Sequence, residues 1–379
     1  MCLYKNNKII QLSVVHYAFD SRIVHRETFS LSKKYCTQLL IPNPSKTKYS
    51  NIDLLEVPFF KRLTDRILKV HPIIILKCLR IYPKIVHFHD AELIPVALIL
   101  RIFGIKIIYD IHDNIYKQWS AKTMNNAAIF RFFFSIFDRL ARRYFYLIFA
   151  EKSYLATYHD LAKPHEVILN YPNLEFFEPF YQARIGKTPQ RTIFYIGQLS
   201  MARGIDTLIK AVALLRPEYP DLQVHLVGGF EFDIRSKQDL YQIENYEETK
   251  ENLVFHGKMD ARLGLRFATE AAVGVALLKS VGDFPESYPT KIFEYMALGM
   301  PVITSDFPLY RPIVQGNQAG FCIDPTNAVA LAQAFRWIME HPEQAQAMGQ
   351  RGREAVKKYY NWQSEEAKLF RLYEQILGT

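Results

Sequence analysis

The sequence predicts an α/β protein made of two Rossmann-like domains in tandem. Short runs rich in β-branched residues alternate with helical patterns along the whole chain, and this alternation is typical of parallel sheets joined by right-handed helical crossovers. A polar stretch near the middle, residues 180–190, contains Gly186 and Pro189 and has no clear period. Because a chain of 379 residues exceeds the usual size of one domain, we expect two domains with a linker in this stretch.

The elements follow in order along each half. In the N-terminal half we expect helices near 22–34 and 60–80, and strands at 8–15, 37–42, 84–90, 105–111 and 147–152. In the C-terminal half we expect helices near 204–216 and 290–298, and strands at 192–197, 222–229, 252–257, 273–278, 301–306 and 320–324. The chain is helical from about residue 326, and its last helix offers an apolar face formed by Trp362, Phe370, Leu372 and Tyr373. We therefore expect an N-terminal domain (1–180), a C-terminal domain (191–357) and a final helix (358–379) that packs back on the protein.

Composition excludes several classes of protein. Hydrophobic residues at 49% and charged residues at 22% are typical of a globular protein and argue against disorder. Four widely spaced cysteines without a CxxC pair indicate neither disulfides nor a zinc site. The N-terminus lacks the pattern of a secretory signal, so we expect a cytoplasmic protein. The sequence contains no GxSxG, Walker A or HExxH motif, which argues against the common hydrolases.

The net charge of +9 favours polyanionic partners. We do not expect nucleic acid to be one of them, because no basic stripe with interleaved aromatic residues is present. Two apolar stretches, 93–109 and 127–150, raise the question of a membrane, yet charged residues interrupt both, so neither is an uncharged spanning segment. The second is basic and aromatic. It is either an interfacial helix at the inner face of the cytoplasmic membrane or a helix packed on a sheet.

The strongest functional signal is the segment DFPESYPTKIFEYMALGMPVITSD. Glu286 lies in the loop before a helix, and Glu294 lies on that helix about one turn in. The N–H groups at the start of this helix favour a phosphate, and Lys291 adds a full charge there. One carboxylate is then suited to hydroxyls of a sugar and the other to a ribose. The alternative is a surface glutamate and a glutamate that only interacts with the helix dipole.

A second loop supports the first interpretation. The sequence GQLSMARGID joins a buried strand to a helix, and Gly197 and Gly204 allow the backbone to approach a ligand closely. Arg203 lies near the start of the helix, so this loop is also a candidate phosphate site. Cleavage of a sugar–diphosphate bond without a metal needs positive charge at the leaving group, and Arg203 and Lys291 could supply it.

Together with the segments FYIGQLSMARGIDTLIKAVALL, ESYPTKIFEYMALGMPVITSD and AMGQRGREAVKKYYNW, these loops resemble the family-4 retaining glycosyltransferases of GT-B fold. The strand-end segments VHYAFDSRIVHRE, VHFHDAELIP and YDIHD are similar, more loosely, to those of bacterial members that build surface polysaccharides. The resemblance implies two Rossmann-like domains facing across a cleft, with a C-terminal helix that docks back.

The resemblance also implies roles for individual residues. Glu286 would contact the transferred sugar and Glu294 the ribose, while Arg203 and Lys291 would contact the diphosphate. His112 would approach the reacting centre from the acceptor side. The remaining residues expected to bind the donor are Gly197, Gly204, Gly257, Lys258 and Thr290, of which Gly257 and Lys258 would hold the base.

This chain departs from the family pattern in three places. It has Gln198 where an arginine is common and Arg203 where a lysine is common, and HYAFDSR replaces a glycine-rich first loop. Within that replacement, Asp20 and Arg22 either contact the acceptor or form a helix cap with a surface partner.

Histidines and aspartates at the ends of the N-terminal strands raise the alternative of a metal site. They are His87, His89, Asp90, His112 and Asp113. Each lies at an expected strand end, and a cleft that needs no metal accounts for them more simply, so we expect no metal ligands.

We therefore expect a metal-independent, retaining hexosyltransferase without a cofactor. Its donor would be a UDP- or GDP-linked hexose or N-acetylhexosamine, and its acceptor a glycan or lipid-linked glycan in the synthesis of capsule, lipopolysaccharide O-antigen or exopolysaccharide. An epimerase or phosphorylase of GT-B fold and a catalytically silent scaffold subunit are the alternatives. Conversion of a UDP-sugar without an acceptor would indicate the first, and failure to bind any nucleotide would indicate the second.

Overall fold

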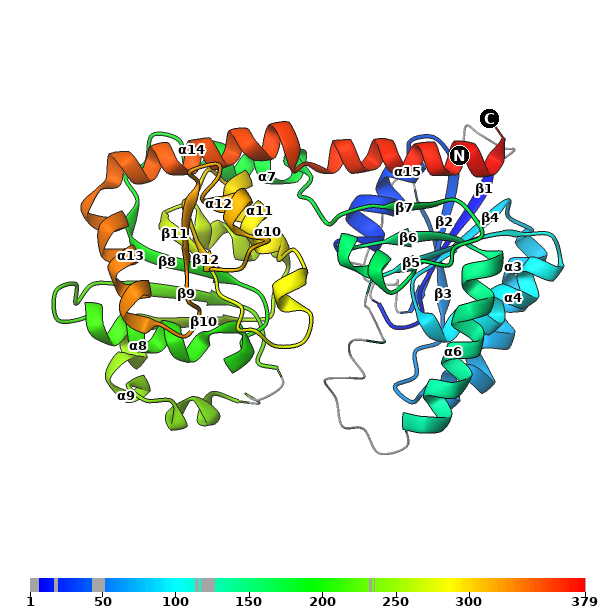
Figure 1. Ribbon diagram of the computed structural model, residues 1–379, viewed down its shortest axis with the longest axis horizontal. Helices are drawn as coiled ribbons and strands as arrows, with labels where there is room; N and C mark the ends of the chain where they lie inside the picture. Colours follow the sequence, from blue (N-terminus) through cyan, green and yellow to red (C-terminus); the bar gives the residue numbers. More distant parts are fainter. Residues whose placement is uncertain are drawn as a thin grey trace. The chain divides into compact units, whose positions relative to one another are not determined.

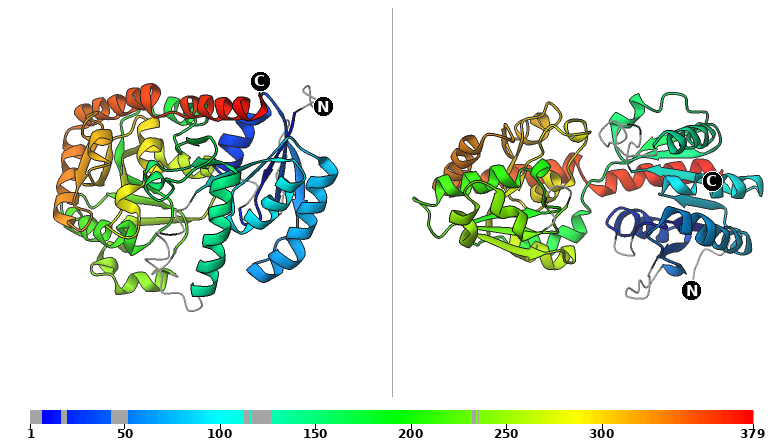
Figure 2. Two further views of the ribbon diagram at one scale, coloured as in Figure 1. Left: turned by 45° about the vertical axis from the view of Figure 1, so that its right-hand side comes forward. Right: turned by 90° about the horizontal axis from the view of Figure 1, so that it is seen from below.

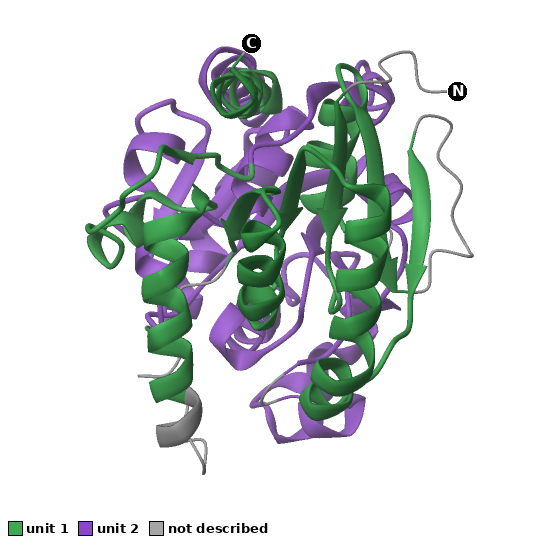
Figure 3. Cartoon of the chain, turned by 90° about the vertical axis from the view of Figure 1, so that its right-hand side faces the viewer, with its two compact units in different colours: residues 1–170, 362–379 green, residues 171–361 purple. Residues whose placement is uncertain are grey.

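The computed structural model consists of two compact units (Figures 1 and 3). It describes residues 7–16, 20–42, 52–112, 116, 127–231, 234 and 236–378, without the side chains of 127–130. Unit 1 comprises Met1–Asn170 and Trp362–Thr379, and unit 2 comprises Tyr171–Asn361. The division falls ahead of the stretch 180–190 that we expected to be a linker, and the start of that stretch belongs to a helix of unit 2.

Unit 1 is built on a sheet of seven parallel strands in the order β3-β2-β1-β4-β5-β6-β7. The strands are β1 (Lys8–Leu12), β2 (Cys36–Pro42), β3 (Asp53–Val57), β4 (Ile85–Phe88), β5 (Lys106–Ile111), β6 (Tyr146–Phe149) and β7 (His165–Val167). The helices are η1 (Ile23–Thr28), α1 (Phe29–Ser32), α2 (Leu63–Asp65), η3 (Arg66–Val70), α3 (His71–Ile81), η4 (Ala91–Leu93), α4 (Ile94–Ile102), α6 (Ala127–Tyr144), η5 (Lys152–Ala156) and α15 (Trp362–Leu377).

The two faces of this sheet bury alternate residues of its strands, as the period of two along a strand requires. On β1, Ile10 faces the core formed with α3, α4 and α6, whereas Ile9 faces the core formed with α15. Helix α15, red in Figures 1 and 2, packs on unit 1 as expected for the C-terminal helix. Its first residue, Trp362, is buried and donates a 2.8 Å hydrogen bond from Nε1 to the hydroxyl oxygen of Ser30.

Unit 2 repeats this architecture with six parallel strands in the order β10-β9-β8-β11-β12-β13. The strands are β8 (Gln190–Ile196), β9 (Gln223–Val227), β10 (Leu253–Gly257), β11 (Ala271–Ala276), β12 (Val302–Ser305) and β13 (Gly320–Ile323). The helices are α7 (Leu174–Gln182), η6 (Met201–Arg203), α8 (Ile205–Leu215), η7 (Lys237–Gln242), α9 (Tyr246–Thr249), η8 (Lys250–Asn252), α10 (Ala261–Gly264), η9 (Leu265–Ala268), η10 (Phe284–Glu286), α11 (Thr290–Ala297), α12 (Arg311–Val314), α13 (Ala328–Glu340) and α14 (Pro342–Tyr359).

The strand order reverses at one point in each sheet. In unit 2 the reversal lies between β8 and β11, and in unit 1 between β1 and β4. Open parallel sheets bind ligands outside the carboxyl ends of the strands at such a point. The fold therefore directs attention to the loops after β8 and β11 in unit 2, and to those after β1 and β4 in unit 1.

Two predictions from composition can be compared with the described residues. Cys36, Cys78 and Cys322 are free thiols, and Cys2 lies outside the described residues. Among the described helices, none has both the length and the apolarity that crossing a membrane would require.

Candidate active site

The carboxyl ends of β8, β9 and β10 lie close together in unit 2 because each is followed by, or ends in, a glycine. The N–H of Gly197 donates to the carbonyl of Val227 (2.8 Å), and the N–H of Gly228 donates to the carbonyl of Gly257 (2.9 Å). A Cβ atom on Gly228 would lie 1.7 Å from the carbonyl oxygen of Gly197, a distance no side chain tolerates. Glycine at these positions thus lets bare backbone form the edge of the sheet where a ligand is expected.

Lys291 of α11 lies directly over the end of β8. A Cβ atom on Gly197 would lie 2.2 Å from its Cε and 2.6 Å from its Nζ, and its ammonium is 5.4 Å from the centre of the Tyr195 ring. Burial lowers the pKa of Lys291 to about 7, and the like charge of Arg203 acts in the same direction while Glu294 opposes it. An anion bound here would relieve the repulsion between the two cations.

Arg203 ends the short helix η6 in the loop after β8. Its guanidinium carbon is 5.4 Å from the centre of the Phe284 ring, and it also interacts with the hydroxyl of Tyr195. Its Nε is buried, with no hydrogen-bond partner among the described residues. A buried donor of this kind favours an acceptor from a ligand.

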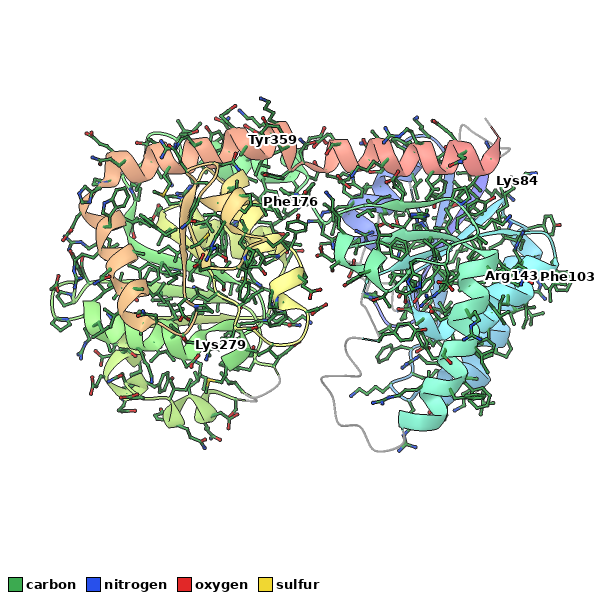
Figure 4. The ribbon with its side chains drawn as sticks, in the orientation of Figure 1. Lys84, Phe103, Arg143, Phe176, Lys279 and Tyr359 are labelled. Carbon is green, nitrogen blue, oxygen red and sulfur yellow. The ribbon has the colours of Figure 1, made fainter. Side chains whose placement is uncertain are left out.

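A lysine and an aspartate connect the two loops at the reversal point. The ammonium of Lys279, labelled in Figure 4, pairs with a carboxylate oxygen of Asp206 at 2.6 Å. The backbone N–H of Lys279 donates to the carbonyl of Ala202 (2.9 Å). These contacts hold the loop after β11 against the loop that carries Arg203.

Two tyrosines fix the segment of the two glutamates. The hydroxyl of Tyr295 accepts from the N–H of Ile196 (3.1 Å) and donates to the carbonyl of Val275 (3.2 Å), which anchors α11 to the ends of β8 and β11. The hydroxyl of Tyr310 lies 2.7 Å and 3.0 Å from the carbonyl oxygens of Phe284 and Ser287. The loop before α11 is therefore held at both of its ends.

The structure places the predicted donor residues as follows. Glu286 is exposed at the end of η10, Thr290 begins α11, and Glu294 is half-buried on the second turn of that helix. Gly204 has a φ of +71° and precedes α8, and a Cβ atom there would meet Leu277 at 2.8 Å. Glu286, Arg203, Lys291, Glu294, Thr290, Gly197 and Gly204 thus belong to the loops and helix at the reversal point.

Gly257 and Lys258 lie at the end of β10, the edge strand of the same sheet. They share the carboxyl edge with the other residues but are two strands away from β8. Sequence reasoning did not identify Tyr195, Tyr295 or Tyr310 as site residues. In the sequence, each of these tyrosines looks like an ordinary aromatic residue of the hydrophobic core. Only the hydrogen bonds of its hydroxyl group in the structure show that it holds a loop of the site.

In unit 1, the residues after β1 and β5 form a buried ionic cluster. Arg22 donates from Nε and Nη2 to the two carboxylate oxygens of Asp110 (2.8 and 2.9 Å), and from Nη1 to the carbonyl of Ile168 (2.8 Å). Asp20 accepts from the N–H groups of Arg22 (2.9 Å) and Ile23 (2.8 Å), so it caps η1. Of the two alternatives for Asp20 and Arg22, the cap is present, but the partner of Arg22 is buried inside the unit.

His112 follows β5 and is bound to this cluster. Its Nε2 lies 2.6 Å from a carboxylate oxygen of Asp110 and 3.1 Å from Nδ1 of His89. Burial opposes ionisation of Asp110, but Arg22 and His112 outweigh it and hold the pKa of Asp110 well below its usual range. Glu27, beside Asp110, has its pKa raised well above normal, by burial first and by the charge of Asp110 second. The pKa values of these two neighbouring carboxyl groups are therefore shifted in opposite directions.

Of the histidines and aspartates that raised the alternative of a metal site, the structure brings only His87 and His89 into one described group of possible ligands. The ligand atoms of one described group, Glu27, His87, His89 and Asp110, lie within 4.8 Å of one another. The Nε of Arg22, however, lies 2.8 Å from Asp110 and 3.0 Å from Glu27, so a guanidinium already supplies the positive charge. Asp90 instead accepts from the N–H of Val14 (2.6 Å), and Asp113 lies outside the described residues.

Comparison with known proteins agrees with this geometry. Residues 178–355 match the family "Glycosyl transferases group 1". The phosphatidyl-myo-inositol mannosyltransferase of Mycolicibacterium smegmatis is 26% identical over 191 residues, which is 50% of this chain and 46% of that protein. The GDP-mannose:cellobiosyl-diphosphopolyprenol alpha-mannosyltransferase of Komagataeibacter xylinus is 25% identical over 193 residues, 51% of this chain and 47% of that protein. The chain thus spans about half the length of the curated relatives it matches.

Solved structures match this chain over nearly its whole length. Sucrose-phosphate synthase of Thermosynechococcus elongatus has a TM-score of 0.74 at 18% identity, covering 98% of this chain and all of that one. Anabaena HepE in complex with UDP-glucose has a TM-score of 0.71 at 14% identity, covering 97% and 99% of the two chains. The architecture is that of GT-B glycosyltransferases. Residues 178–355, which carry the two phosphate-binding candidates at the carboxyl ends of β8 and β11, match the glycosyl transferases group 1 family.

Proposed function

We propose that this protein is a retaining, metal-independent glycosyltransferase that transfers a hexose or N-acetylhexosamine from a UDP- or GDP-linked donor. Its acceptor is a glycan or lipid-linked glycan in surface-polysaccharide synthesis. The observation that carries this proposal is the pair of cations, Lys291 and Arg203, held close enough to repel each other at the reversal point of the unit 2 sheet. A diphosphate supplies the negative charge that this arrangement lacks.

The charge that develops on the leaving diphosphate gives the two cations their catalytic task. When the glycosidic bond breaks, negative charge grows on the phosphate oxygens, and preorganised cations stabilise it without reorganising. Lys291 and Arg203 therefore replace a metal ion in this proposal. Glu294 on α11 is assigned to the ribose hydroxyls and Glu286 in the preceding loop to the hydroxyls of the sugar.

Retention of configuration follows if the acceptor attacks on the face that the diphosphate leaves. An oxygen of the departing phosphate then accepts the proton of the acceptor hydroxyl, while the sugar passes through an oxocarbenium-like state of the kind that glycosidases also stabilise. Glu286 orients the sugar and forms no bond to it. His112 of unit 1 is assigned to the acceptor side of the reaction.

Two relatives support a lipid-linked acceptor. The names of the Mycolicibacterium and Komagataeibacter proteins include a phosphatidyl-myo-inositol and a diphosphopolyprenol. In this chain, α6 exposes Phe132, Phe133 and Ile136 together with arginines on its outer side. We propose that the protein acts in the cytoplasm and contacts the inner face of the membrane through this helix.

The donor site is tested by thermal unfolding in EDTA with UDP, GDP or ADP. One nucleotide should stabilise the wild-type protein, by about 2.7 kcal/mol at a concentration of a hundred times its dissociation constant. Glu294→Ala and Arg203→Ala should weaken this stabilisation. Arg191→Ala is the matched control, because Arg191 is exposed at the other end of β8 and pairs with Asp221.

Absence of any nucleotide effect on the wild-type protein would contradict the proposal and favour a silent scaffold. The enzymatic alternative is separated by product analysis. Conversion of a UDP-sugar in the absence of every acceptor would indicate an epimerase or phosphorylase and would rule out obligatory transfer.

A further inference from the structure

A buried chain of polar side chains runs through unit 1 from His112, after β5, to Tyr373 on α15. Nδ1 of His89 lies 3.1 Å from Nε2 of His112, and Nε2 of His89 lies 2.6 Å from Oε1 of Gln11. The amide nitrogen of Gln11 lies 2.9 Å from Nδ1 of His87. The hydroxyl of Tyr373 lies 2.9 Å from that same Nδ1. These contacts form one hydrogen-bonded path, which runs from His112 through His89, Gln11 and His87 to Tyr373.

The carboxylate of Asp110 decides which nitrogen of His112 carries a proton. Asp110 is ionised, because Arg22 binds both of its oxygens, and an ionised carboxylate only accepts hydrogen bonds. At 2.6 Å from Asp110, Nε2 of His112 must therefore be an N–H donor. Neutral imidazole has one such nitrogen, so the lone pair of neutral His112 lies on Nδ1.

The other end of the path is consistent with the same assignment. Oε1 of Gln11 is an acceptor, so Nε2 of His89 carries the proton of that ring. Burial lowers the pKa of His89 to about 4, so the ring is neutral and its Nδ1 accepts. Nε2 of His112 lies 3.1 Å from that Nδ1 and a carboxylate oxygen of Asp110 lies 3.3 Å from it. Of these two atoms, only Nε2 of His112 can donate a proton, because an ionised carboxylate only accepts.

The orientation of Gln11 on which this depends follows from His112. His87 is neutral, because burial holds its pKa well below normal, and its Nδ1 lies 2.9 Å from the Gln11 amide nitrogen and 2.9 Å from the Tyr373 hydroxyl. If the amide of Gln11 were turned over, its N–H would face His89, which would then carry its proton on Nδ1. That proton would point at the N–H of His112 that Asp110 requires.

We propose that Asp110, His89, Gln11 and Tyr373 are positioning residues that hold His112 with its proton on Nε2, so that Nδ1 is the nitrogen offered to the substrate. Nδ1 has no hydrogen-bond partner in the described part of unit 1, and the side chain is 16% exposed. That Nδ1 is offered to the substrate rests on the function proposed above, whereas the position of the proton on Nε2 does not. The final helix of the chain thereby acts on a histidine that lies more than 250 residues earlier in the sequence.

Such an arrangement prepares Nδ1 to accept a hydrogen bond or a proton from a hydroxyl group. If Nδ1 gains a proton, the imidazolium that forms is stabilised by the carboxylate of Asp110 on the opposite nitrogen, as in other carboxylate–histidine pairs. Tyr154 adds a further constraint, because its hydroxyl donates to the carbonyl of His112 (2.9 Å).

The test is long-range ¹H–¹⁵N NMR of the full-length protein labelled at histidine, without nucleotide, at pH 8. His112→Gln identifies the signals of His112. The expected result is a protonated Nε2 and an unprotonated Nδ1 for His112, and the same tautomer for His89. A proton on Nδ1 of His112 would overturn the inference.

Two substitutions test the path itself. Gln11→Leu removes the acceptor of His89 and should give that ring a mixture of tautomers, with shifted signals for His112. Tyr373→Phe should shift the signals of His87 and His112, whereas Tyr35→Phe, which alters a buried ring stacked 5.7 Å from Tyr373, should not. Equal responses to the two tyrosine changes would contradict the role of Tyr373.

These outcomes separate the inference from the proposed function. If the expected tautomer is found in a protein that binds no nucleotide, the path is supported and the glycosyltransferase proposal fails. If nucleotide binds but His112 carries its proton on Nδ1, the glycosyltransferase proposal is supported and the inference about the tautomer fails.

Discussion

The ionisation of Lys291 is the property of a single residue that should respond most directly to a bound diphosphate. Its pKa of about 7 in the nucleotide-free protein lies below the ordinary value of 10.5, because the half-buried side chain loses contact with water and because Arg203 repels a second positive charge. A bound anion favours the charged form and must raise this pKa. Binding is therefore linked to uptake of a proton wherever the free lysine is neutral.

At pH 8 we predict that nucleotide binding takes up about one proton. Free Lys291 is mostly neutral at this pH, whereas in the complex it is charged, and a terminal phosphate with a pKa of about 6 is already ionised. The affinity should consequently rise as the pH falls from 9 to 7 and level off below that. Calorimetry in buffers of different ionisation enthalpy measures the number of protons taken up.

Lys291→Arg provides the control for this prediction. Arginine keeps the positive charge but does not titrate in this range, so the variant should bind nucleotide with little proton uptake and a flat dependence on pH between 7 and 9. Equal proton uptake by both proteins would show that another group is responsible.

At the scale of the elements, the contact between the ends of β8 and β9 depends on one glycine of a pair. Gly228 has a φ of +148°, and a Cβ atom there would lie 1.7 Å from the carbonyl oxygen of Gly197. The next residue, Gly229, has open space around its Cβ position. Neighbouring glycines thus differ completely in what a methyl group would meet.

We predict that Gly228→Ala destabilises the protein by about 3 kcal/mol or more, because the backbone of the loop after β8 must move to remove the overlap. Nucleotide stabilisation should be lost along with the position of Arg203. Gly229→Ala should change stability by less than about 1 kcal/mol. Urea unfolding compares the two variants, and similar losses in both would contradict the geometric explanation.

The strands that the sequence did not predict are those with the weakest patterns. β3 (Asp53–Val57) and β7 (His165–Val167) are short edge strands with charged residues, which is how edges avoid pairing with other chains but also how they escape notice in a sequence. The helix expected near 22–34 begins as a π-helical turn, η1. That turn follows the buried Arg22 and contains the buried Glu27, polar residues that helical periodicity alone does not place.

At the scale of the whole molecule, the net charge of +9 and the exposed apolar side chains of α4 and α6 favour binding to an anionic membrane. Phe132 and Phe133 of α6 are 62% and 54% exposed, and Ile102 at the end of the adjacent α4 is 83% exposed. Phe103 and Arg143, labelled in Figure 4, belong to the same two segments and are also exposed. Aromatic and basic side chains together are typical of helices that lie in a membrane interface.

We predict that the protein floats with liposomes containing anionic lipid at low salt and is released as salt screens the charges. Replacing Phe132 and Phe133 by serine should weaken binding by about tenfold, because two exposed aromatic rings no longer enter the interface. Tyr241→Ser, which alters an equally exposed ring of unit 2, should have no effect. Failure of the wild-type protein to bind at low salt would contradict the membrane proposal.

The sequence by itself determined the two parallel sheets and the loops that matter. Alternating β-branched and helical segments specify strand and helix, and the loops of Arg203 and Glu286 each follow an expected strand of the C-terminal half. These features are local, because a turn, a helix start or a strand is encoded by neighbouring residues. For the same reason the sequence identified Lys291, Glu294 and His112 as candidates without showing what they touch.

Only the tertiary structure decided the contacts between distant residues. It placed Lys291 over Gly197, and burial together with the nearby charge of Arg203 lowers the pKa of this lysine. It paired Arg22 with Asp110 inside unit 1, away from a surface partner, and it joined Gln11 to Tyr373 across 362 positions of the chain. Contacts of this kind arise from the packing of complete layers, and no periodicity within a short segment specifies which side chain of one layer meets which side chain of another.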